Sequence, residues 1–269
     1  MDEQEGEARK MEIDLTKPNP ARIVDYYLGG HHNFEIDRIL GDRAAEMWPG
    51  GFVEDTRRLR RCLQRAGSYM ASEKGLTYFL DFGSGLPTCG NTHEAVVAIN
   101  PQAKVIYSDI DHLTVAYGRE IVAHEPNVRY VWCDAADPST LLDSSEAKKL
   151  LGDHRRVGII FMALAHFLDD ETLASGARKL YEWAAPGSHL FYTAESETWQ
   201  TDPYLREVSK VVHRAGIALY QRTEQENLAL LSPWRLTEHG VVRNLQWGLP
   251  EGEKDPEERL IAYSMVLYK

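Results

Sequence analysis

Cysteine is scarce in this chain, with three residues among 269. They are Cys62, Cys89 and Cys133, which lie far apart and form no CxxC pair. An odd number of widely spaced cysteines argues against a disulfide framework and against a zinc site of the usual spacing. We therefore expect a protein of a reducing compartment, the cytoplasm.

Long apolar runs and an excess of basic residues are also missing. No segment approaches the roughly 18 consecutive apolar residues of a membrane-spanning helix, and the charged N-terminus MDEQEGEARKMEID is no signal peptide. The net charge of −11 disfavours nucleic acid, which is bound through clustered Lys and Arg. One dense basic cluster occurs, and we expect it to be the solvated face of a helix: Arg57, Arg58, Arg60 and Arg61. We expect neither a membrane nor a nucleic-acid partner, and a disordered N-terminus over residues 1–14.

Motifs of two large enzyme classes are absent as well. The chain has no GxSxG nucleophile elbow and no GK[ST] after its glycine-rich stretch. Serine hydrolases and P-loop nucleotide hydrolases are therefore disfavoured.

What the chain contains is an alternation of strand-like and helix-like segments. Residues 15–74 predict an N-terminal helical cap, broken by the turn-rich stretches LGGHHN and WPGG. Residues 75–269 predict one Rossmann-like α/β domain, because apolar runs at 77–82, 104–110, 129–135, 157–163 and 188–194 alternate with helical segments. This alternation predicts a mostly parallel sheet with helices on both faces. Residues 234–247 and 259–269 are predicted as further strands, the last an antiparallel addition at the sheet edge.

A glycine-rich loop, YFLDFGSGLPTCGNTHE, follows the first predicted strand. In an open parallel sheet, ligands bind outside the carboxyl ends of the strands, where this loop should lie. Thr88, Asn91 and Thr92 could cap the next helix, whose N-terminus would favour an anionic group. A dinucleotide fingerprint requires a third glycine where Thr88 stands. Three successive predicted strands end in acids, Asp81, Asp109 and Asp134, and the second has the spacing of a ribose-binding carboxylate.

Two motifs give the chain a specific resemblance. The stretch R-x-x-D-Y-x-L-G-G-x-x-N-F, residues 22–34, and the loop G-L-P-T-x-G-N-T-H, residues 85–93, resemble a family of class I S-adenosylmethionine-dependent methyltransferases long catalogued as a domain of unknown function. The resemblance covers about residues 18–269. Family members usually carry a Lys-Asp-like pair where this chain has His31 and His32.

The resemblance implies a class I methyltransferase fold with S-adenosylmethionine as cofactor and S-adenosylhomocysteine as product. Asp81 would hold the cofactor's ammonium directly or through water, Asp109 the ribose, and Asp134 with the next backbone N–H the adenine. Gly30 and Asn33 would approach the methionine part. The expected cofactor-binding residues are Gly30, Asn33, Asp81, Gly83, Gly85, Thr88, Asn91, Asp109, Ile110, Asp134, Ala135 and Ala163.

A general base is needed only if the acceptor loses a proton during methyl transfer. The candidate catalytic residues are His166, His32 and Tyr26. A capping or packing role is the alternative for His166, surface exposure for His32 and core packing for Tyr26. Tyr26, Tyr27 and Phe34 could present aromatic faces to the sulfonium or the acceptor. No metal is expected, because the adjacent side chains of His31 and His32 diverge.

We therefore predict a cytoplasmic S-adenosylmethionine-dependent methyltransferase acting on a small molecule, with a homodimer left open. An aromatic or heterocyclic acceptor would suit four candidate wall residues: Trp199, Tyr204, Tyr220 and Trp234. The alternatives are a non-catalytic regulatory protein that binds S-adenosylmethionine and, less favoured by the glycine spacing, an NAD-dependent oxidoreductase. An ordinary intrahelical ion pair would account for Arg22 and Asp25.

Overall fold

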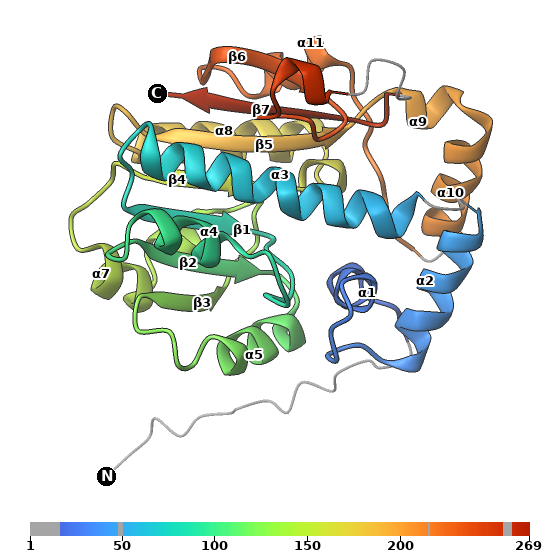
Figure 1. Ribbon diagram of the computed structural model, residues 1–269, viewed down its shortest axis with the longest axis horizontal. Helices are drawn as coiled ribbons and strands as arrows, with labels where there is room; N and C mark the ends of the chain where they lie inside the picture. Colours follow the sequence, from blue (N-terminus) through green and yellow to red (C-terminus); the bar gives the residue numbers. More distant parts are fainter. Residues whose placement is uncertain (1–16, 48–50, 215, 255–259) are drawn as a thin grey trace.

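The computed structural model describes residues 17–47, 51–214, 216–254 and 260–269 (Figure 1). The predicted disordered segment 1–14 and most of the WPGG turn lie outside these residues. The strands are β1 (Tyr78–Phe82), β2 (Lys104–Asp109), β3 (Val128–Trp132), β4 (Gly158–Phe161), β5 (His189–Glu195), β6 (Arg235–Arg243) and β7 (Ala262–Tyr268). The helices are α1 (Pro20–Tyr27), α2 (Glu35–Met47), α3 (Phe52–Ser72), α4 (Thr92–Ile99), α5 (His112–Ile121), α6 (Ser139–Leu142), α7 (Ser145–Leu151), α8 (Asp170–Trp183), α9 (Thr198–Thr201), α10 (Pro203–Arg214) and α11 (Glu224–Leu230), with 3₁₀ turns η1 (Ala165–Phe167) and η2 (Glu251–Glu253).

The strands form one seven-stranded sheet in the order β3-β2-β1-β4-β5-β7-β6. Strands β1 to β5 pair in parallel, and β7 is antiparallel to both β5 and β6. The predicted α/β fold is thereby confirmed. The prediction that the last strand lies at the sheet edge is wrong, because β6 takes the edge. Five consecutive residues of β7 are buried, as an interior strand requires, whereas β6 carries exposed charged residues that suit an edge.

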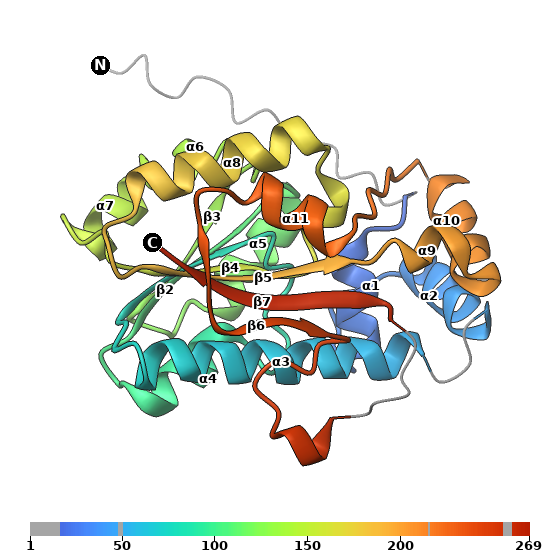
Figure 2. The same cartoon turned by 90° about the horizontal axis from the view of Figure 1, so that it is seen from above.

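Helices cover both faces of this sheet, as Figure 2 shows: α3 and α4 lie on one side, and α7, α8 and α11 on the other. The α3 side packs Leu63 and Met70 against Phe79 of β1. On the opposite face, α8 places Leu173 and Leu180 beside Ile159. Since α3 belongs to this core, α1 and α2 are the part of the predicted cap that projects past the sheet. None of the described helices has the length and apolar character that crossing a membrane requires.

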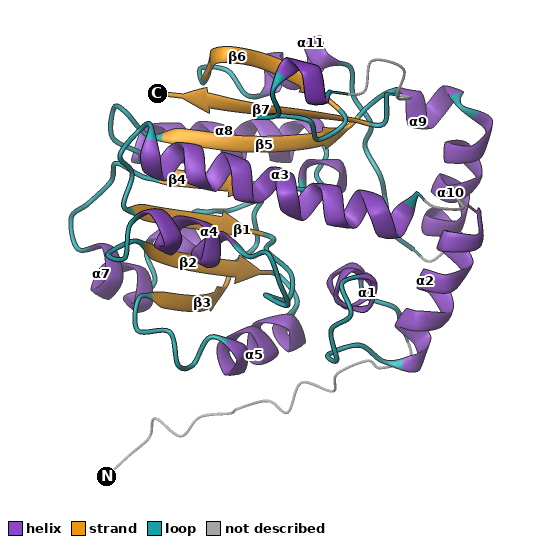
Figure 3. Cartoon of the chain, viewed as in Figure 1, coloured by secondary structure: helices purple, strands orange, loops and turns teal. Residues whose placement is uncertain are grey.

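The carboxyl ends of the parallel strands point toward α1 (Figure 3). Helix α1 packs against α2, and α2 in turn contacts α10. Leu205 and Val208 of α10 form an apolar cluster with Trp199 and Ile261. These helices form a layer over the edge of the sheet at which parallel α/β folds bind ligands.

A buried ion pair holds α1 to α2. Nε of Arg22 lies 2.7 Å from Oδ2 of Asp37, and both side chains are almost completely buried. Asp37 also accepts from the backbone N–H groups of Asn19 and Phe34. Arg22 therefore pairs with Asp37, and the alternative interpretation of an intrahelical pair with Asp25 is wrong. Arg22, the arginine of the first motif, thus helps to hold the start of α1 against α2.

Asp25 joins α1 to the glycine-rich loop. One carboxylate oxygen accepts from the Thr88 hydroxyl, and the other accepts from the His32 backbone N–H and the Asn33 amide, each at 2.9 Å. A Cβ atom on Gly30 would lie 2.0 Å from the carboxylate of Asp25. Gly30 is therefore required by the space that Asp25 occupies, and the motif acts as a latch between α1 and the loop.

Replacing Gly30 with alanine should lower the free energy of unfolding by about 2 kcal/mol, because the new Cβ overlaps a buried carboxylate. Gly29→Ala is the matched control, since its Cβ meets nothing within 4 Å and its cost of about 1 kcal/mol comes from a φ of 79°. In an Asp25→Ala background the cost of Gly30→Ala should shrink, while that of Gly29→Ala stays the same. Denaturant unfolding measures the cost of each glycine substitution in the unmodified protein and in the Asp25→Ala variant. If Gly30→Ala costs as much in the Asp25→Ala variant as in the unmodified protein, the latch is refuted.

Candidate functional site

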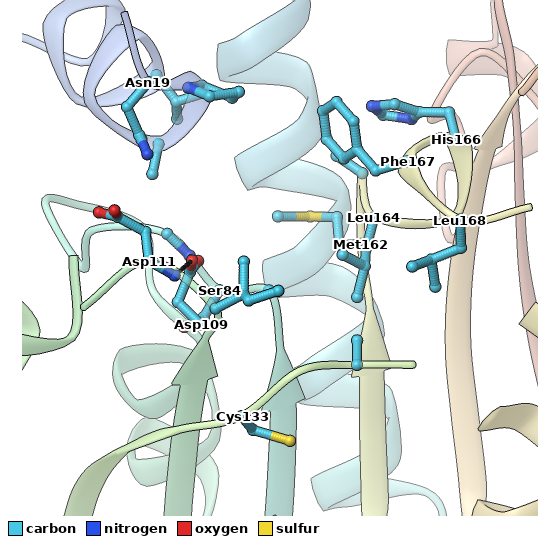
Figure 4. A pocket seen from close by; sticks show the side chains of 18 of the residues that line it. Asn19, Ser84, Asp109, Asp111, Cys133, Met162, Leu164, His166, Phe167 and Leu168 are labelled. Atoms are coloured by element: carbon cyan, nitrogen blue, oxygen red, sulfur yellow. Dashed lines mark hydrogen bonds between the residues drawn. The ribbon is translucent and has the colours of Figure 1, made fainter. Parts of the chain in front are cut away.

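A cavity of about 400 Å³ opens at the carboxyl ends of β1, β2 and β4, under α1 (Figure 4). It lies where the strand order reverses between β1 and β4, the usual ligand-binding position of an open α/β sheet. The predicted site residues that line it are Gly83, Gly85, Asp109, Ile110, Asp134, Ala135, Ala163 and His166. Other lining residues are Asn19, Pro20, Ala21, Val24, Leu59, Arg60, Ser84, Asp111, Cys133, Met162, Leu164, Phe167, Leu168 and Ile217.

Asp109 ends β2 and carries the main carboxylate of this cavity. Its two oxygens accept from the backbone N–H groups of Gly85 and Asp111, at 3.1 and 3.0 Å. Burial raises the pKa of Asp109, and these hydrogen bonds lower it. Each carboxylate oxygen can accept more than one hydrogen bond. Asp109 is therefore held rigidly and can still accept from two hydroxyl groups of a ligand.

The glycine-rich loop brings its backbone to the cavity. Gly83 and Gly85 have φ values of 59° and 62°, a left-handed conformation that favours glycine. The hydroxyl of Tyr130 supports the loop by donating to the Gly85 carbonyl at 2.7 Å. The loop therefore presents backbone to a ligand, with no side chain at either glycine.

Asp134 and Ala135 follow β3 on the neighbouring wall. The Asp134 carboxylate accepts from the Ala136 backbone N–H at 2.9 Å. Ile110 extends an apolar side chain that is 57% exposed. Ala163, across the cavity after β4, has a φ of 51°, which costs an L-residue about 1 to 2 kcal/mol. Such strain is often found at functional sites.

Arg60 is placed differently from the sequence prediction. It is buried, lines the cavity and donates to the Leu86 carbonyl at 3.3 Å, whereas Arg57, Arg58 and Arg61 stay partly exposed beside Glu54 and Asp55. The expectation of a solvated face is therefore wrong for Arg60. Its helical spacing of four and three residues from Thr56 and Leu63, both buried, was the signal that could have found it.

Asp81 lies behind the loop. It is 4% exposed and accepts from the Thr92 hydroxyl at 2.5 Å. Burial raises the pKa of Asp81 to about 7, although the hydrogen bond from Thr92 and the charge of Arg60 lower it. Asp81 is not one of the described residues that line the cavity.

Several predicted site residues lie outside the described cavity lining. Gly30, Asn33 and Thr88 surround Asp25 in the latch. Asn91 is the N-cap of α4, and its backbone N–H and amide donate to Glu94.

The other two catalytic candidates also lie away from the cavity lining. Tyr26 donates to Asp42 at 2.7 Å, and this hydrogen bond raises the pKa of the Tyr26 hydroxyl. The ring of His32 lies 5.1 Å from that of Tyr117. Of the three catalytic candidates, His166 alone is among the described residues that line the cavity.

His166 follows β4 in η1, and Figure 4 shows it across the cavity from Asp109. Its side chain is buried, and its Nδ1 atom has no hydrogen-bond partner within the described part of the chain. Oε1 of Glu195, at the end of β5, is 4.0 Å away. Glu195 was not predicted from the sequence, although it ends β5 as Asp109 ends β2, and this shared position was the signal that could have found it.

Of the four expected aromatic wall residues, Trp199 lines a second, neighbouring cavity. Trp234 is buried beneath α8 and donates to the Ala177 carbonyl at 2.9 Å. Tyr204 and Tyr220 are 63% and 38% exposed. The four side chains therefore form no common wall, because Trp234 faces the core and Tyr204 and Tyr220 face solvent. A role of Trp199 in binding an acceptor stays a prediction.

Comparison with known proteins relates the chain to one family. A family model described as S-adenosyl methyltransferase matches residues 6–267. A candidate methyltransferase from Thermobifida fusca is 31% identical, with a TM-score of 0.86 over 95% of this chain and 96% of the other. A DUF574 family protein from Streptomyces avermitilis is 28% identical, with a TM-score of 0.85 over 95% and 99%.

More distant structures share the fold. The 1,6-didemethyltoxoflavin-N1-methyltransferase of Burkholderia thailandensis, solved with S-adenosylhomocysteine, is 14% identical, with a TM-score of 0.50 over 77% of this chain and 78% of the other. The mixed, mostly parallel sheet described above is that of class I methyltransferases. No curated protein sequence is similar enough to match the chain.

Proposed function

The chain belongs to the S-adenosyl methyltransferase family, and we propose that it methylates a small molecule, with its S-adenosylmethionine cofactor in the cavity beneath α1. The observation that carries this proposal is Asp109, a rigidly held carboxylate on the cavity wall beside two left-handed glycines. The cofactor supplies a methyl group on an activated sulfonium. The residues of the chain bind and orient the reactants and exclude water.

The cavity residues suit the parts of this cofactor. Asp109 would accept from the two ribose hydroxyls, and Asp134 with the Ala135 backbone N–H would hold the adenine. Ile110 offers an apolar face for the adenine ring. The backbone at Gly83 and Gly85 would lie along the methionine part, and Asp81 would support its ammonium from behind the loop. The latch residues Gly30, Asn33 and Thr88 would act by holding α1 over the cofactor.

Arg60 would bind the cofactor's carboxylate. Its guanidinium makes one hydrogen bond, to Leu86, in the described part of the chain, and a buried cation is stabilised by a bound anion. Arg60→Gln should weaken binding of S-adenosylhomocysteine at least tenfold. It should leave binding of 5′-methylthioadenosine, which lacks the amino acid part, unchanged. Arg61→Gln is the control, because Arg61 is exposed and paired with Glu54. Calorimetry checks both ligands, and equal losses for them would exclude this role.

A small acceptor is favoured over a macromolecule. The chain carries a net charge of −11, and the α1 helix covers the cavity, so a reacting group must be small enough to enter beneath it. His166 would receive a proton if the acceptor nitrogen or oxygen loses one.

Transfer of a deuterated methyl group tests the proposal. The protein would be incubated with S-adenosylmethionine labelled on the methyl group and a library of small amines, phenols and heterocycles, and products would be followed by mass spectrometry. Labelled product that disappears with Asp109→Ala supports the enzyme. Tight cofactor binding without any transfer would favour the non-catalytic regulatory alternative, and binding of NAD alone would favour the oxidoreductase.

A further inference from the structure

A second cavity, of about 200 Å³, adjoins the cofactor cavity. We call it the apolar chamber. It lies between α1, α2, α10 and the end of β5. The residues that line both cavities are Pro20, Val24, His166, Phe167 and Ile217. The two spaces therefore share a boundary, and His166 lies on it.

The walls of the apolar chamber are almost entirely hydrocarbon. They include Ile23, Leu40, Met47, Phe52, Trp199 and Val212. An engineered apolar cavity of about 150 Å³ holds a benzene molecule. A chamber of this size therefore suits an apolar group of one or two rings.

Few polar side chains line this chamber, and two of them are already satisfied. The Tyr27 hydroxyl donates to the Gly41 carbonyl, and the Thr56 hydroxyl donates to the Phe52 carbonyl, at 2.7 and 2.8 Å. His166 and Glu195 differ from these. Nδ1 of His166 is buried without a partner among the described residues, and Glu195 accepts on Oε2 from Gln221 at 3.2 Å. Hydrogen-bonding capacity on Nδ1 and Oε1 therefore remains for a ligand.

The charge of Glu195 and His166 restricts the class of ligand further. Within the described part of the chain, no Lys or Arg side chain lines the apolar chamber. The neighbouring guanidinium of Arg222 is bonded to Asp170 and to the carbonyls of Ala165 and Leu168. A carboxylate and an unprotonated imidazole nitrogen both accept hydrogen bonds. Because Nδ1 of His166 and Oε1 of Glu195 are 4.0 Å apart, they suit a ligand atom that donates two hydrogen bonds, as an ammonium does and a phenol does not.

From these observations we propose that the apolar chamber is the acceptor site and that it takes a hydrophobic primary or secondary amine, bound through Glu195 and His166. This inference rests on the proposed methyltransferase function and names its acceptor class. Bound as an ammonium, the amine donates one N–H to Glu195 and one to Nδ1 of His166. Transfer of the second proton to Nδ1 leaves a neutral nitrogen and an imidazolium beside the Glu195 carboxylate.

The electrons and protons of the step balance. The nitrogen lone pair forms an N–C bond to the methyl group while the C–S bond breaks and sulfur keeps its electron pair. The products are a methylated ammonium and S-adenosylhomocysteine, and His166 returns its proton to water. The residues of the chain accept the proton and hold the amine at the boundary between the two cavities.

Three probes with the same phenylethyl group test the ligand class on protein loaded with S-adenosylhomocysteine: 2-phenylethylamine, the uncharged propylbenzene and the anionic 3-phenylpropionate. Ligand-detected NMR titration should show the amine binding at least tenfold more tightly than the other two. Glu195→Gln should remove this preference and leave propylbenzene binding unchanged. Glu207→Gln is the matched control, because Glu207 is an exposed acid of α10 paired with Lys210.

A second variant tests the location. Val211→Phe adds a ring to the wall of the chamber, away from the cofactor cavity. It should weaken binding of all three probes at least tenfold and change the dissociation constant of S-adenosylhomocysteine less than twofold. Equal binding of the three probes, or amine binding unaffected by Val211→Phe, overturns the inference. If S-adenosylhomocysteine itself does not bind, the proposed function fails, and the probes titrated against the free protein still test the chamber.

Discussion

Replacing Asp109 with alanine should lower the affinity for S-adenosylmethionine and S-adenosylhomocysteine about a thousandfold. Each hydrogen bond to a charged group contributes about 1.5 to 3 kcal/mol, and Asp109 would accept two from the ribose. The loss should be the same for both ligands, because they share the ribose. Isothermal titration calorimetry measures it directly.

A matched acid supplies the control for this prediction. Asp137 follows β3, is exposed and pairs with Lys179 at 2.9 Å, and it is absent from the described lining of the cavity. Asp137→Ala should leave both affinities unchanged. If Asp109→Ala changes the affinities less than threefold, the ribose lies elsewhere and the assignment of the cavity is wrong.

Stability should fall as the pH rises from 5 to 8, and Asp81→Asn should remove most of this fall. The pKa of Asp81 is about 7 in the folded chain because of burial, well above its ordinary value of 3.8. The folded state therefore holds a proton that the unfolded state releases, so the stability present below about pH 4 is lost as the pH rises through 7. At about 1.36 kcal/mol per pKa unit, the loss between pH 5 and pH 8 is about 3 kcal/mol.

Thermal unfolding of the protein without cofactor measures this effect. At pH 8 the Asp81→Asn variant should have a Tm about 6 °C or more above that of the unmodified protein. At pH 5 the two should differ less, because asparagine resembles the protonated acid and can still accept from Thr92. A fall left in the variant reports Asp109, whose pKa burial also raises. Burial lowers the pKa of His93 and of His189, so these two side chains add stability as the pH rises from 5 and oppose the fall. A variant that is less stable at pH 8 would show that the ionised Asp81 stabilises the fold.

The parallel sheet could be predicted from the sequence because its strands are buried on both faces and are continuously apolar. The acids at or just beyond the ends of β1, β2 and β3 could be placed along one edge of the sheet, since the carboxyl ends of parallel strands lie on one side. Asp109 and Asp134 do line the cavity, although their binding roles remain predictions. The order of β6 and β7 was predicted wrongly although the same criterion applies: AYSMVLY of β7 is almost continuously apolar, whereas RLTEHGVVR of β6 carries charged residues.

Contacts between segments that lie far apart in the chain could not be predicted from the sequence. Arg22 meets Asp37 rather than Asp25 because α2 folds back on α1. Gly30 leaves room for the carboxylate of Asp25. In the sequence alone, a glycine required by packing looks the same as a glycine that approaches a ligand. Glu195 and His166 lie 29 residues apart and meet because β4 and β5 are neighbours in the sheet.

The most direct test of the cavity's role is a crystal structure with S-adenosylhomocysteine bound. We expect both ribose hydroxyls within hydrogen-bonding distance of the Asp109 carboxylate, the adenine beside Asp134 and Ile110, and the carboxylate of the amino acid part on Arg60. The apolar chamber beyond His166 should stay free of the nucleoside. A nucleoside seated in that chamber, or away from Asp109, would contradict the assignment of both cavities.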